Sequence, residues 1–370
     1  MKIAIVHDWL TNMGGSERVI INFKEIYKEA PIYTTLYNEK NLDKELQGID
    51  VRTSFLQNIK GANKKHQKFF PLMPIAFESF DLNDYDVVLS SSSSCSKGVI
   101  TNPETMHVCY CHSPMRYAWE FYYEYTKDMK GIKKKLIKYF MNYMRNWDVC
   151  SSNRVDYFIA NSENVAKRIW KHYKRESVVI HPPVRCSLFE IGDVDEEYFL
   201  VLSRLVEYKR IDLAVEAFNE LGLPLVIIGD GPEREKLEKM ANKNIKFLGR
   251  QPDSVIKEYY SKCRAFIFPG EEDFGITPLE AQASGRPVIA FGKGGALETV
   301  VDGKTGLFFK TQSVKDLVEC VKKFENTKFD KFEIRKHAES FDEKIFKEKI
   351  ESFIKEKNSE FKENKKWMVI

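Results

Sequence analysis

Short apolar runs alternate along the chain with longer stretches that suit helices. In the first half the runs are Ile3–Val6, Ile32–Leu36, Val87–Leu89, Val108–Cys111, Tyr157–Ala160 and Val178–Ile180. In the second half they are Phe199–Leu202, Leu225–Ile228, Ile245–Leu248, Ala265–Phe268, Val288–Phe291 and Leu307–Phe309. Continuous apolar strands that alternate with helices are typical of parallel sheets covered on both faces. The pattern therefore predicts an α/β protein with two doubly wound domains.

The boundary between these domains is predicted near residues 184–197. The motif His-Pro-Pro-Val ends the first series of strands, and the acidic stretch Ile-Gly-Asp-Val-Asp-Glu-Glu precedes a new strand. We expect an N-terminal domain over 1–185, a C-terminal domain over 186–345, and a helix with a charged tail over 346–370 that crosses back to the N-terminal domain. Within that tail, residues 355–366 are expected to be solvated or frayed. Ligands bind such sheets at the carboxyl ends of the strands, so two domains facing across a cleft would each supply part of one site.

Composition excludes several classes of protein. The 370 residues are 43% hydrophobic and 30% charged, as in a soluble globular protein, and a formal net charge of +4 is too small to indicate nucleic-acid binding. No run of eighteen apolar residues and no signal-peptide core occurs, which predicts a cytoplasmic protein that does not span the membrane. The seven cysteines include no C-x-x-C pair, which fits a reducing compartment. Cys109, Cys111 and His112 lack the usual spacing of zinc ligands, and no metal site is predicted.

The segment E-D-F-G-I-T-P-L-E carries the clearest candidate chemistry. Glu272 and Glu280 bracket it, and Thr277-Pro278 fits a helix start with Thr at the cap and Pro at the first helical position. Glu280 would then lie in the first turn and Glu272 in the preceding loop. Free amides at a helix start favour phosphate, and carboxylates accept hydrogen bonds from sugar hydroxyls. The segment predicts a site for a phosphorylated, hydroxyl-rich ligand, although acidic residues also occur in first turns simply for their favourable interaction with the helix dipole.

Two further strand ends carry polar candidates. Gly14-Gly15 follow the first strand and precede a helix expected to begin near Ser16, so backbone amides there can approach a phosphate or sugar, or the glycines simply form a tight turn. The dinucleotide fingerprint G-x-G-x-x-G is absent from this position, which disfavours a nicotinamide oxidoreductase. Arg204 and Lys209 follow the first strand of the second domain, where both can converge on an anion such as a diphosphate. A pair of solvated loop charges is the alternative.

Taken together, these motifs resemble the retaining GT-B glycosyltransferases of glycosyltransferase family four, which have two Rossmann-like domains. The motifs are S-R-L-V-E-Y-K-R, G-D-G-P, E-E-D-F-G-I-T-P-L-E-A-Q-A-S-G-R-P-V-I-A and G-G-A-L-E-T-V-V-D-G-K-T-G, in the family's order and approximate spacing. The N-terminal half is similar more thinly, through G-G-S-E-R, C-Y-C-H-S-P-M-R-Y-A-W and A-N-S-E-N-V-A-K-R-I. The stretch H-S-P-M-R-Y-A-W looks most like mannosyltransferases of bacterial surface-polysaccharide assembly.

The resemblance implies roles for particular residues. Glu280 would accept hydrogen bonds from the ribose of a nucleotide sugar, and Glu272 would lie beside the transferred hexose. His112 would correspond to the family histidine beneath the sugar ring, although a histidine at a strand end is often only a packed or capping residue. The implied catalytic residues are His112, Glu272, Arg204 and Lys209. The implied donor-binding residues are Gly15, Arg204, Lys209, Glu272, Phe274, Gly275, Ile276, Thr277 and Glu280.

These roles are consistent with the chemistry of glycosyl transfer. Breaking the bond from the anomeric carbon to a nucleoside diphosphate puts negative charge on the leaving phosphate, which Arg204, Lys209 and helix amides can stabilise. We therefore expect no metal and no cofactor beyond the nucleotide sugar. Metal-dependent transferases often use an Asp-x-Asp loop, but Asp84-Tyr-Asp86 enters a strand and Asp193-Val-Asp195 lies in the linker. Retention of anomeric configuration is implied by the resemblance, and the family's front-face route needs no nucleophilic carboxylate.

Residues 127–154 form a basic segment with interleaved apolar positions. It contains eight lysines and arginines against two aspartates, with the apolar residues Leu136, Ile137, Phe140, Met141, Met144 and Trp147 between them. A basic amphipathic helix of this kind can lie on an anionic membrane, which suits a lipid-linked acceptor and a location on the inner face of the cell membrane. A solvated helix that packs its apolar face inward is the alternative.

The sequence thus predicts a hexosyltransferase that moves mannose from GDP-mannose to a glycan or a lipid-linked saccharide in cell-surface polysaccharide biosynthesis. Two other functions fit the same features. A non-hydrolysing nucleotide-sugar epimerase shares the two-domain architecture, and a regulatory protein could bind the nucleotide sugar without turnover. The presence of Glu272, Arg204, Lys209 and His112 argues against a site that has lost its activity.

Overall fold

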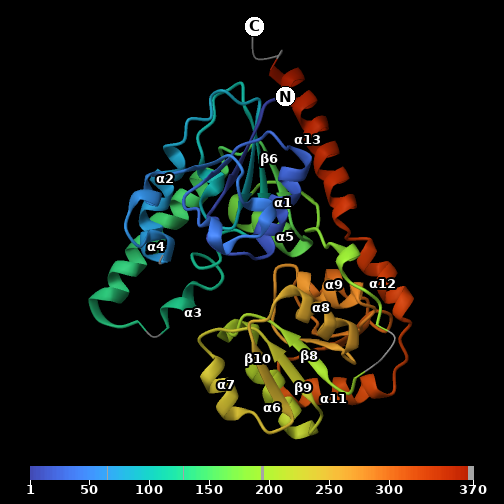
Figure 1. Ribbon diagram of the computed structural model, residues 1–370. Coiled ribbons are helices and arrows are strands. Elements are labelled where there is room, and N and C mark those ends of the chain that lie inside the picture. Colours follow the sequence, from blue (N-terminus) through green and yellow to red (C-terminus); the bar gives the residue numbers. More distant parts are fainter. Residues whose placement is uncertain (65, 128, 193–195, 366–370) are drawn as a thin grey trace. The chain divides into compact units, whose positions relative to one another are not determined.

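A computed structural model describes residues 1–64, 66–127, 129–192 and 196–365 of the chain (Figure 1). The chain forms two compact units, one of Met1–His181 with Phe346–Ile370 and one of Pro182–Ile345. These units are called the N-terminal and the C-terminal domain below. The change of unit falls between His181 and Pro182, a few residues before the boundary at 185 that the sequence suggests.

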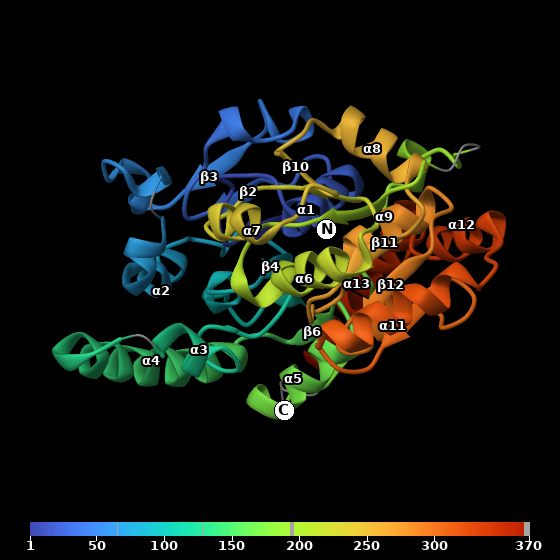
Figure 2. The same cartoon turned by 90° about the horizontal axis from the view of Figure 1, so that it is seen from below.

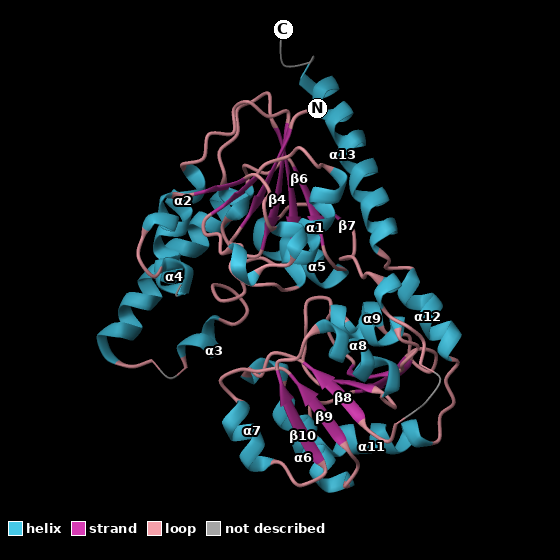
Figure 3. Cartoon of the chain, viewed as in Figure 1, coloured by secondary structure: helices cyan, strands magenta, loops and turns pink. Residues whose placement is uncertain are grey.

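The sheet of the N-terminal domain has seven parallel strands in the order β3-β2-β1-β4-β5-β6-β7. Strands are drawn in magenta in Figure 3. The strands are β1 (Ile3–His7), β2 (Ile32–Thr34), β3 (Val51–Thr53), β4 (Val87–Ser92), β5 (Met106–Cys111), β6 (Tyr157–Ala160) and β7 (Ser177–Val179). The helices are α1 (Gly15–Ile26), α2 (Met73–Glu78), α3 (Tyr122–Thr126), α4 (Gly131–Ser152), α5 (Glu163–Tyr173) and α13 (Glu343–Lys365). Short 3-10 helices are η1 (Glu39–Asn41), η2 (Lys44–Leu46), η3 (Phe55–Asn58), η4 (Ala62–Lys64), η5 (His66–Leu72) and η6 (Ser96–Gly98).

The C-terminal domain contains six parallel strands in the order β10-β9-β8-β11-β12-β13. The strands are β8 (Phe199–Leu202), β9 (Leu225–Ile228), β10 (Ile245–Gly249), β11 (Phe266–Phe268), β12 (Val288–Phe291) and β13 (Gly306–Phe309). The helices are α6 (Ile211–Leu221), α7 (Arg234–Met240), α8 (Asp253–Lys262), α9 (Ile276–Ala283), α10 (Ala296–Thr299), α11 (Val314–Glu325) and α12 (Lys331–Glu339), with 3-10 helices η7 (Cys186–Leu188) and η8 (Glu207–Lys209). The predicted pair of doubly wound α/β domains is confirmed.

Strand alternation explains why each sheet is covered on both faces. In the C-terminal domain Phe199 and Val201 of β8 pack on one side with helices α6 and α11, whereas Leu200 packs on the other side with α8, α9 and α12. The same alternation in β1 sends Ile3 and Ile5 toward one core cluster and Ala4 and Val6 toward another. Because successive side chains of a strand point to opposite faces, an apolar run of four residues supplies both cores.

The strand missing from the sequence prediction is β3. It has the sequence Val-Arg-Thr at the edge of its sheet, and its three residues are half-buried or exposed. Edge strands pair on one side only and bury little, so they need no apolar run. The other twelve strands coincide with predicted runs, with ends that differ by a few residues.

Helix α13 changes one part of the prediction for the C-terminus. Residues 355–365, expected to be solvated or frayed, continue this helix beside the N-terminal domain, and many of them are exposed, so they are solvated but not frayed (Figure 1). Phe346 lies in the N-terminal core, where its ring stacks on Phe23 with 5.9 Å between centroids, and Ile350, Phe353 and Ile354 follow at helical spacing. An apolar stripe at this spacing holds the helix in spite of its many charges. The closing residues Trp367–Ile370 and Lys366 lie outside the described part of the chain.

The order of the strands also locates the candidate sites. In the N-terminal sheet the chain runs outward from β1 to β3 and then resumes on the other side of β1 with β4. In the C-terminal sheet it runs outward from β8 to β10 and resumes beside β8 with β11. Such a reversal, here called a switch point, separates the loops that follow the two central strands, and ligands of doubly wound sheets bind there.

Candidate active site

Residues predicted to bind the donor diphosphate follow β8 at the switch point of the C-terminal domain. Arg204 comes two residues after the strand and is exposed, and its side chain has no hydrogen bond or ion pair within the described residues. Lys209 ends the short helix η8, and its ammonium forms an ion pair with the carboxylate of Glu272. The two side chains of that pair are 21% and 12% exposed, so the pair is largely shielded from water. The switch point thus combines a paired lysine with an available arginine.

Glu272 reaches Lys209 because glycines allow close approach of three loops. A Cβ on Gly270 would lie 2.9 Å from the carbonyl oxygen of Lys209, and a Cβ on Gly294 would lie 2.5 Å from that of Glu272. Gly294 also has a φ of 64°, which L-residues rarely adopt, and the amide of Gly295 donates to the Glu272 carbonyl at 2.8 Å. Larger residues at these positions would separate the loop after β11 from η8.

Helix α9 begins two residues earlier than predicted. Gly275 is its N-cap with a φ of 99°, Ile276 and Thr277 open the first turn, and Pro278 comes third. Proline is tolerated throughout a first turn, because the N–H groups there have no partner within the helix. Glu280 therefore lies in the second turn, not the first. The amides of Ile276 and Thr277 face outward from a glycine cap in the positions where helix starts bind anions.

Glu280 is buried and held by an aromatic hydroxyl. It is 4% exposed, and its Oε2 accepts a hydrogen bond from the Tyr260 hydroxyl at 3.2 Å. The same hydroxyl lies 3.3 Å from the carbonyl oxygen of Thr277. Phe274 is also buried, in the core beneath α9. The carboxylate is therefore positioned by the core of the C-terminal domain, and Tyr260 is a positioning residue that the sequence prediction missed.

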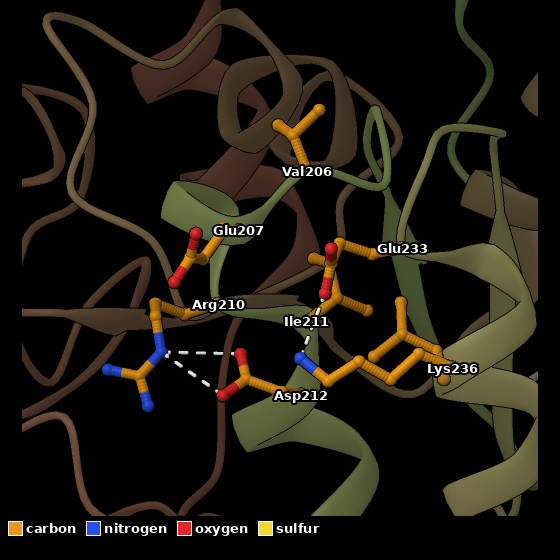
Figure 4. A pocket seen from close by; sticks show the side chains of 8 residues that line it. Val206, Glu207, Arg210, Ile211, Asp212, Glu233 and Lys236 are labelled. Atoms are coloured by element: carbon orange, nitrogen blue, oxygen red, sulfur yellow. Dashed lines mark hydrogen bonds and ion pairs between the residues drawn. The ribbon is translucent and has the colours of Figure 1, made fainter. Parts of the chain in front are cut away.

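A separate cavity of about 300 Å³ lies next to η8 and is not the predicted site (Figure 4). Its lining is Val206, Glu207, Arg210, Ile211, Asp212, Glu233, Lys236 and Leu237. The cations in it are already paired, with Arg210 Nε 3.2 Å from Asp212 Oδ1 and Lys236 Nζ 2.9 Å from Glu233 Oε2. Neither Arg204 nor Lys209 lines this cavity, and its own two cations are paired with neighbouring carboxylates.

The N-terminal switch point carries the predicted histidine. His112 directly follows β5, and its Nε2 lies 2.7 Å from the hydroxyl oxygen of Ser91 on β4. Burial, and secondarily the electrostatic interaction with the neighbouring His7, lower the pKa of His112 to about 3, so its ring is neutral near neutral pH. His7 ends β1, and its Nδ1 lies 3.2 Å from both the hydroxyl and the carbonyl oxygen of Ser91.

The loop after β4 is fixed by a buried carboxylate. Asp8 accepts hydrogen bonds from the amides of Ser93, Cys95 and Ser96 at 2.7 to 2.8 Å. Gly15 is the first residue of helix α1, and Glu17 is the acidic residue in the first turn of that helix. The sequence indicated this region through Gly14-Gly15 and, by the family resemblance, through His112. It did not indicate Asp8 or Ser91, because hydrogen bonds between residues distant in the chain leave no local pattern in a sequence.

Within the described residues, no group of three His, Cys, Asp or Glu side chains is arranged to hold a metal ion. Asp84 and Asp86 precede β4, whereas Asp193 and Asp195 lie outside the described residues. Cys109 and Cys111 are both buried on one face of β5.

Family profiles match the chain from residue 13 to residue 348 without a gap. The profile described as Glycosyltransferase Family 4 matches residues 13–188, and the one described as Glycosyl transferases group 1 matches residues 189–348. The chain belongs to glycosyltransferase family 4. The resemblance seen in its sequence motifs is therefore confirmed, and the chain is a glycosyltransferase by family.

Known relatives include several mannosyltransferases. The alpha-1,3/1,6-mannosyltransferase ALG2 of Dictyostelium discoideum is 25% identical over 88% of this chain and 90% of its own length. A GDP-mannose-dependent alpha-(1-6)-phosphatidylinositol monomannoside mannosyltransferase of Mycolicibacterium smegmatis is 35% identical over 34% of this chain and 38% of its own length. An uncharacterized glycosyltransferase of Methanocaldococcus jannaschii is 26% identical, and the match spans 57% of this chain and 60% of that relative.

Solved structures confirm the GT-B fold. HepE of Anabaena, crystallised in complex with UDP, superposes with a TM-score of 0.71 over 96% of this chain and all of that one, at 16% identity. At that identity the likeness shows the fold alone. The donor, the acceptor and the roles of individual residues must therefore be inferred from the residues of this chain.

Proposed function

We propose that this glycosyltransferase transfers mannose from GDP-mannose to a glycan or lipid-linked saccharide, with retention of configuration and without a metal ion. The observation that carries the proposal is the group of Lys209, Glu272 and Arg204 at the C-terminal switch point, beside the glycine-capped start of α9. Mannose as the sugar is supported by the mannosyltransferases among the relatives.

The donor diphosphate would bind to Arg204, Lys209 and the first amides of α9. An incoming phosphate competes with Glu272 for Lys209, because that lysine is already paired. Glu272 would then be released to accept hydrogen bonds from hydroxyls of the hexose, while Glu280 accepts from the ribose. As the bond to the anomeric carbon breaks, the two cations and the amides stabilise the charge on the leaving phosphate.

The acceptor hydroxyl would attack the anomeric carbon on the side from which the diphosphate leaves. Its proton passes to the leaving phosphate oxygen, so one C–O bond forms, one breaks, and no enzyme carboxylate is consumed. Product with the anomeric configuration of the donor is expected in an NMR analysis of the new linkage. An inverted linkage would contradict the retaining reaction.

A thermal-shift panel of nucleotide sugars tests the choice of donor. A donor at about 100 times its dissociation constant stabilises the folded protein by roughly 2.7 kcal/mol, which a shift in Tm reveals. GDP-mannose is expected to give the largest shift, above UDP-glucose, GDP alone and free mannose. An assay that contains donor but no acceptor distinguishes the epimerase, since only an epimerase would convert the donor in that mixture.

Helix α4 supports the further proposal that the protein binds anionic membranes. Four large side chains at positions i, i+4, i+7 and i+11 lie on one face and are strongly exposed: Ile132 (77%), Leu136 (65%), Tyr139 (85%) and Tyr143 (53%). Lysines 133, 135 and 138 beside them are exposed too, whereas Phe140, Met141, Met144 and Trp147 pack into the N-terminal core. The first turns of α4 project from the domain (Figures 1 and 2). Helix α4 is shorter than the predicted segment 127–154. Helix α3 precedes it in the chain, and Asp128 lies outside the described residues.

An exposed apolar stripe flanked by lysines is typical of helices that lie on a membrane surface. None of the described helices has the length and apolar character needed to cross a bilayer. Liposome sedimentation tests the contact, with binding expected to vesicles that contain anionic lipid and lost in the double variant I132S/L136S. Phe332→Ser is the matched control, because Phe332 is 65% exposed on α12 of the other domain. If the protein sediments neither with vesicles that contain anionic lipid nor with vesicles that lack it, the proposal of membrane binding is wrong.

A further inference from the structure

A connected polar chain links helix α1 to His112 through the N-terminal switch point. Ser16 Oγ donates to Glu17 Oε2 at 2.9 Å, and Glu17 Oε1 lies 3.5 Å from His7 Nε2. His7 Nδ1 lies 3.2 Å from Ser91 Oγ, which lies 2.7 Å from His112 Nε2. His7, Ser91 and His112 come from the ends of three neighbouring strands, with His7 and Ser91 directly paired in the register of β1 and β4.

Hydrogen-bond geometry assigns a proton to each link of this chain. His7 Nδ1 lies 3.2 Å from the carbonyl oxygen of Ser91, which can only accept, so Nδ1 must carry a hydrogen. The adjacent Ser91 hydroxyl oxygen then faces a donor on the His7 side. Its own hydrogen is free to point at His112 Nε2, which becomes an acceptor.

Burial strengthens this assignment. His7 is 2% exposed, Glu17 is 6% exposed and Ser91 is fully buried, so water cannot readily exchange with these bonds. The carboxylate of Glu17, 3.5 Å from His7 Nε2, holds the His7 ring from its other edge. A neutral His112 whose Nε2 accepts must carry its one hydrogen on Nδ1. That nitrogen has no hydrogen-bond partner within the described residues.

We propose that Glu17, His7 and Ser91 are positioning residues that fix His112 as the tautomer with hydrogen on Nδ1, so that His112 presents a hydrogen-bond donor to its ligand. The ligand class is a sugar hydroxyl or a glycosidic oxygen, either of which accepts from a neutral N–H. The identity of the ligand rests on the proposed transfer reaction, but the tautomer does not. A donor held in one orientation by buried partners needs no rearrangement when the ligand oxygen binds.

Nitrogen-15 NMR of histidine-labelled protein tests the tautomer directly. The seven histidines give separate pairs of ring nitrogens, and His112 is identified by the signals lost in H112Q. Wild-type protein is expected to show a protonated Nδ1 and an unprotonated Nε2 for His112. A protonated Nε2 overturns the proposal, whatever reaction the enzyme catalyses.

Variants then test the positioning role. Ser91→Ala is expected to mix the two tautomers and to lower kcat about tenfold with little change in the KM for the donor, since one neutral hydrogen bond is lost. Ser91→Cys keeps a weak donor of similar size and is expected to fall between Ser91→Ala and wild type. Ser90→Ala is the matched control, because Ser90 is the neighbouring residue of β4 and bonds His107 Nε2 at 2.8 Å on the other face.

The failure of this inference is distinguishable from failure of the proposed function. If no nucleotide sugar supports transfer, the proposed function fails while the NMR result still decides the tautomer. If transfer occurs and Ser91→Ala matches Ser90→Ala in both kcat and the His112 spectrum, the positioning role is refuted. Glu17→Gln, which keeps the shape of the side chain, serves as a second variant in case Ser91→Ala does not fold.

Discussion

The two domains place different chemistry at the same topological position. At the C-terminal switch point, between β8 and β11, the side chains are charged and partly reach solvent: Arg204 is exposed and Lys209 is paired with Glu272. At the N-terminal switch point, between β1 and β4, the side chains of His7 and Ser91 are buried and joined by hydrogen bonds to a neutral His112.

This difference teaches that the fold supplies only the location of a site. Both sheets open a crevice where the strand order reverses, but the residues after each strand decide what can bind. A charged and accessible group suits a diphosphate, which arrives with negative charge. A buried and neutral group suits a hydroxyl, whose orientation matters more than its charge. Four experiments distinguish these two kinds of site.

Replacing Lys209 should have the largest effect. Lys209→Ala removes a cation from the leaving diphosphate and leaves Glu272 without its partner, so kcat/KM should fall by about two orders of magnitude, on the order of 3 kcal/mol. Steady-state kinetics with the identified donor measures the loss. Lys236→Ala is the control, since this lysine lies in the nearby compensated cavity and should retain wild-type activity. Near-normal turnover by Lys209→Ala would refute the diphosphate role.

Acid should weaken the N-terminal domain through its buried histidines. Burial lowers the pKa of His107 from 6.5 to about 4 and, together with His7, that of His112 to about 3. Below about pH 6.5 the unfolded chain takes up protons that the folded chain refuses, so the free energy of unfolding falls as the pH falls, by about 2 kcal/mol for His107 at about pH 5.

Denaturant unfolding at a series of pH values between 7 and 4, followed by a probe in the N-terminal domain, measures this slope. The slope should flatten in His107→Gln, even if that variant is less stable at every pH. Lys97 and Arg154 also disfavour a positive charge on the His107 ring, and its Nε2 lies 2.8 Å from Ser90 Oγ. An unchanged slope in His107→Gln would mean that this histidine is protonated in the folded state.

Removing the Tyr260 hydroxyl should have a modest effect on the C-terminal site. Tyr260→Phe deletes one hydrogen bond to the buried Glu280, so we expect about 1 kcal/mol less stability and a few-fold weaker binding of the donor. Chemical denaturation and calorimetric titration of the donor measure the two effects. A loss of stability without any change in affinity for the donor would contradict a role of Glu280 in binding the ribose.

Salt should affect the two sites unequally. Raising the salt concentration from about 0.05 M to about 0.5 M screens exposed charges, so donor affinity should fall a few-fold and Arg204→Ala should be less sensitive. The ring-nitrogen signals of His112 should not move over the same range, because its partners are buried. Equal sensitivity of both sites would contradict the contrast between them.

Sequence patterns predict the fold well because parallel strands need continuous apolar runs. Apolar runs predict twelve of the strands. They do not predict β3, because Val51–Thr53 is an edge strand whose side chains are half-buried or exposed. Helix ends were less predictable. Thr277-Pro278 looked like a cap and first residue, but Gly275 with its positive φ caps the helix two residues earlier. In the C-terminal segment, many charged residues surround the apolar positions that pack α13 against the N-terminal core, so the sequence did not predict this packing.

Candidate site residues can be predicted from the sequence where charged side chains directly follow a buried strand. Charged side chains after buried strands, such as Arg204 and Lys209, stand out in a sequence, and the structure pairs Lys209 with Glu272. Their roles with a donor remain predictions. Tyr260 and Ser91 did not stand out, because both residue types are common in cores and act here through contacts with residues distant in sequence.

Calorimetric titration of GDP-mannose into wild-type protein and into the double variant R204A/K209A tests whether these two cations hold the donor. We expect wild-type protein to bind GDP-mannose, and GDP more weakly. In the double variant the affinity for both should fall by about two orders of magnitude, while the unfolding transition stays normal. Equal affinity of wild type and a folded double variant would contradict a donor diphosphate held at the switch point of the C-terminal domain.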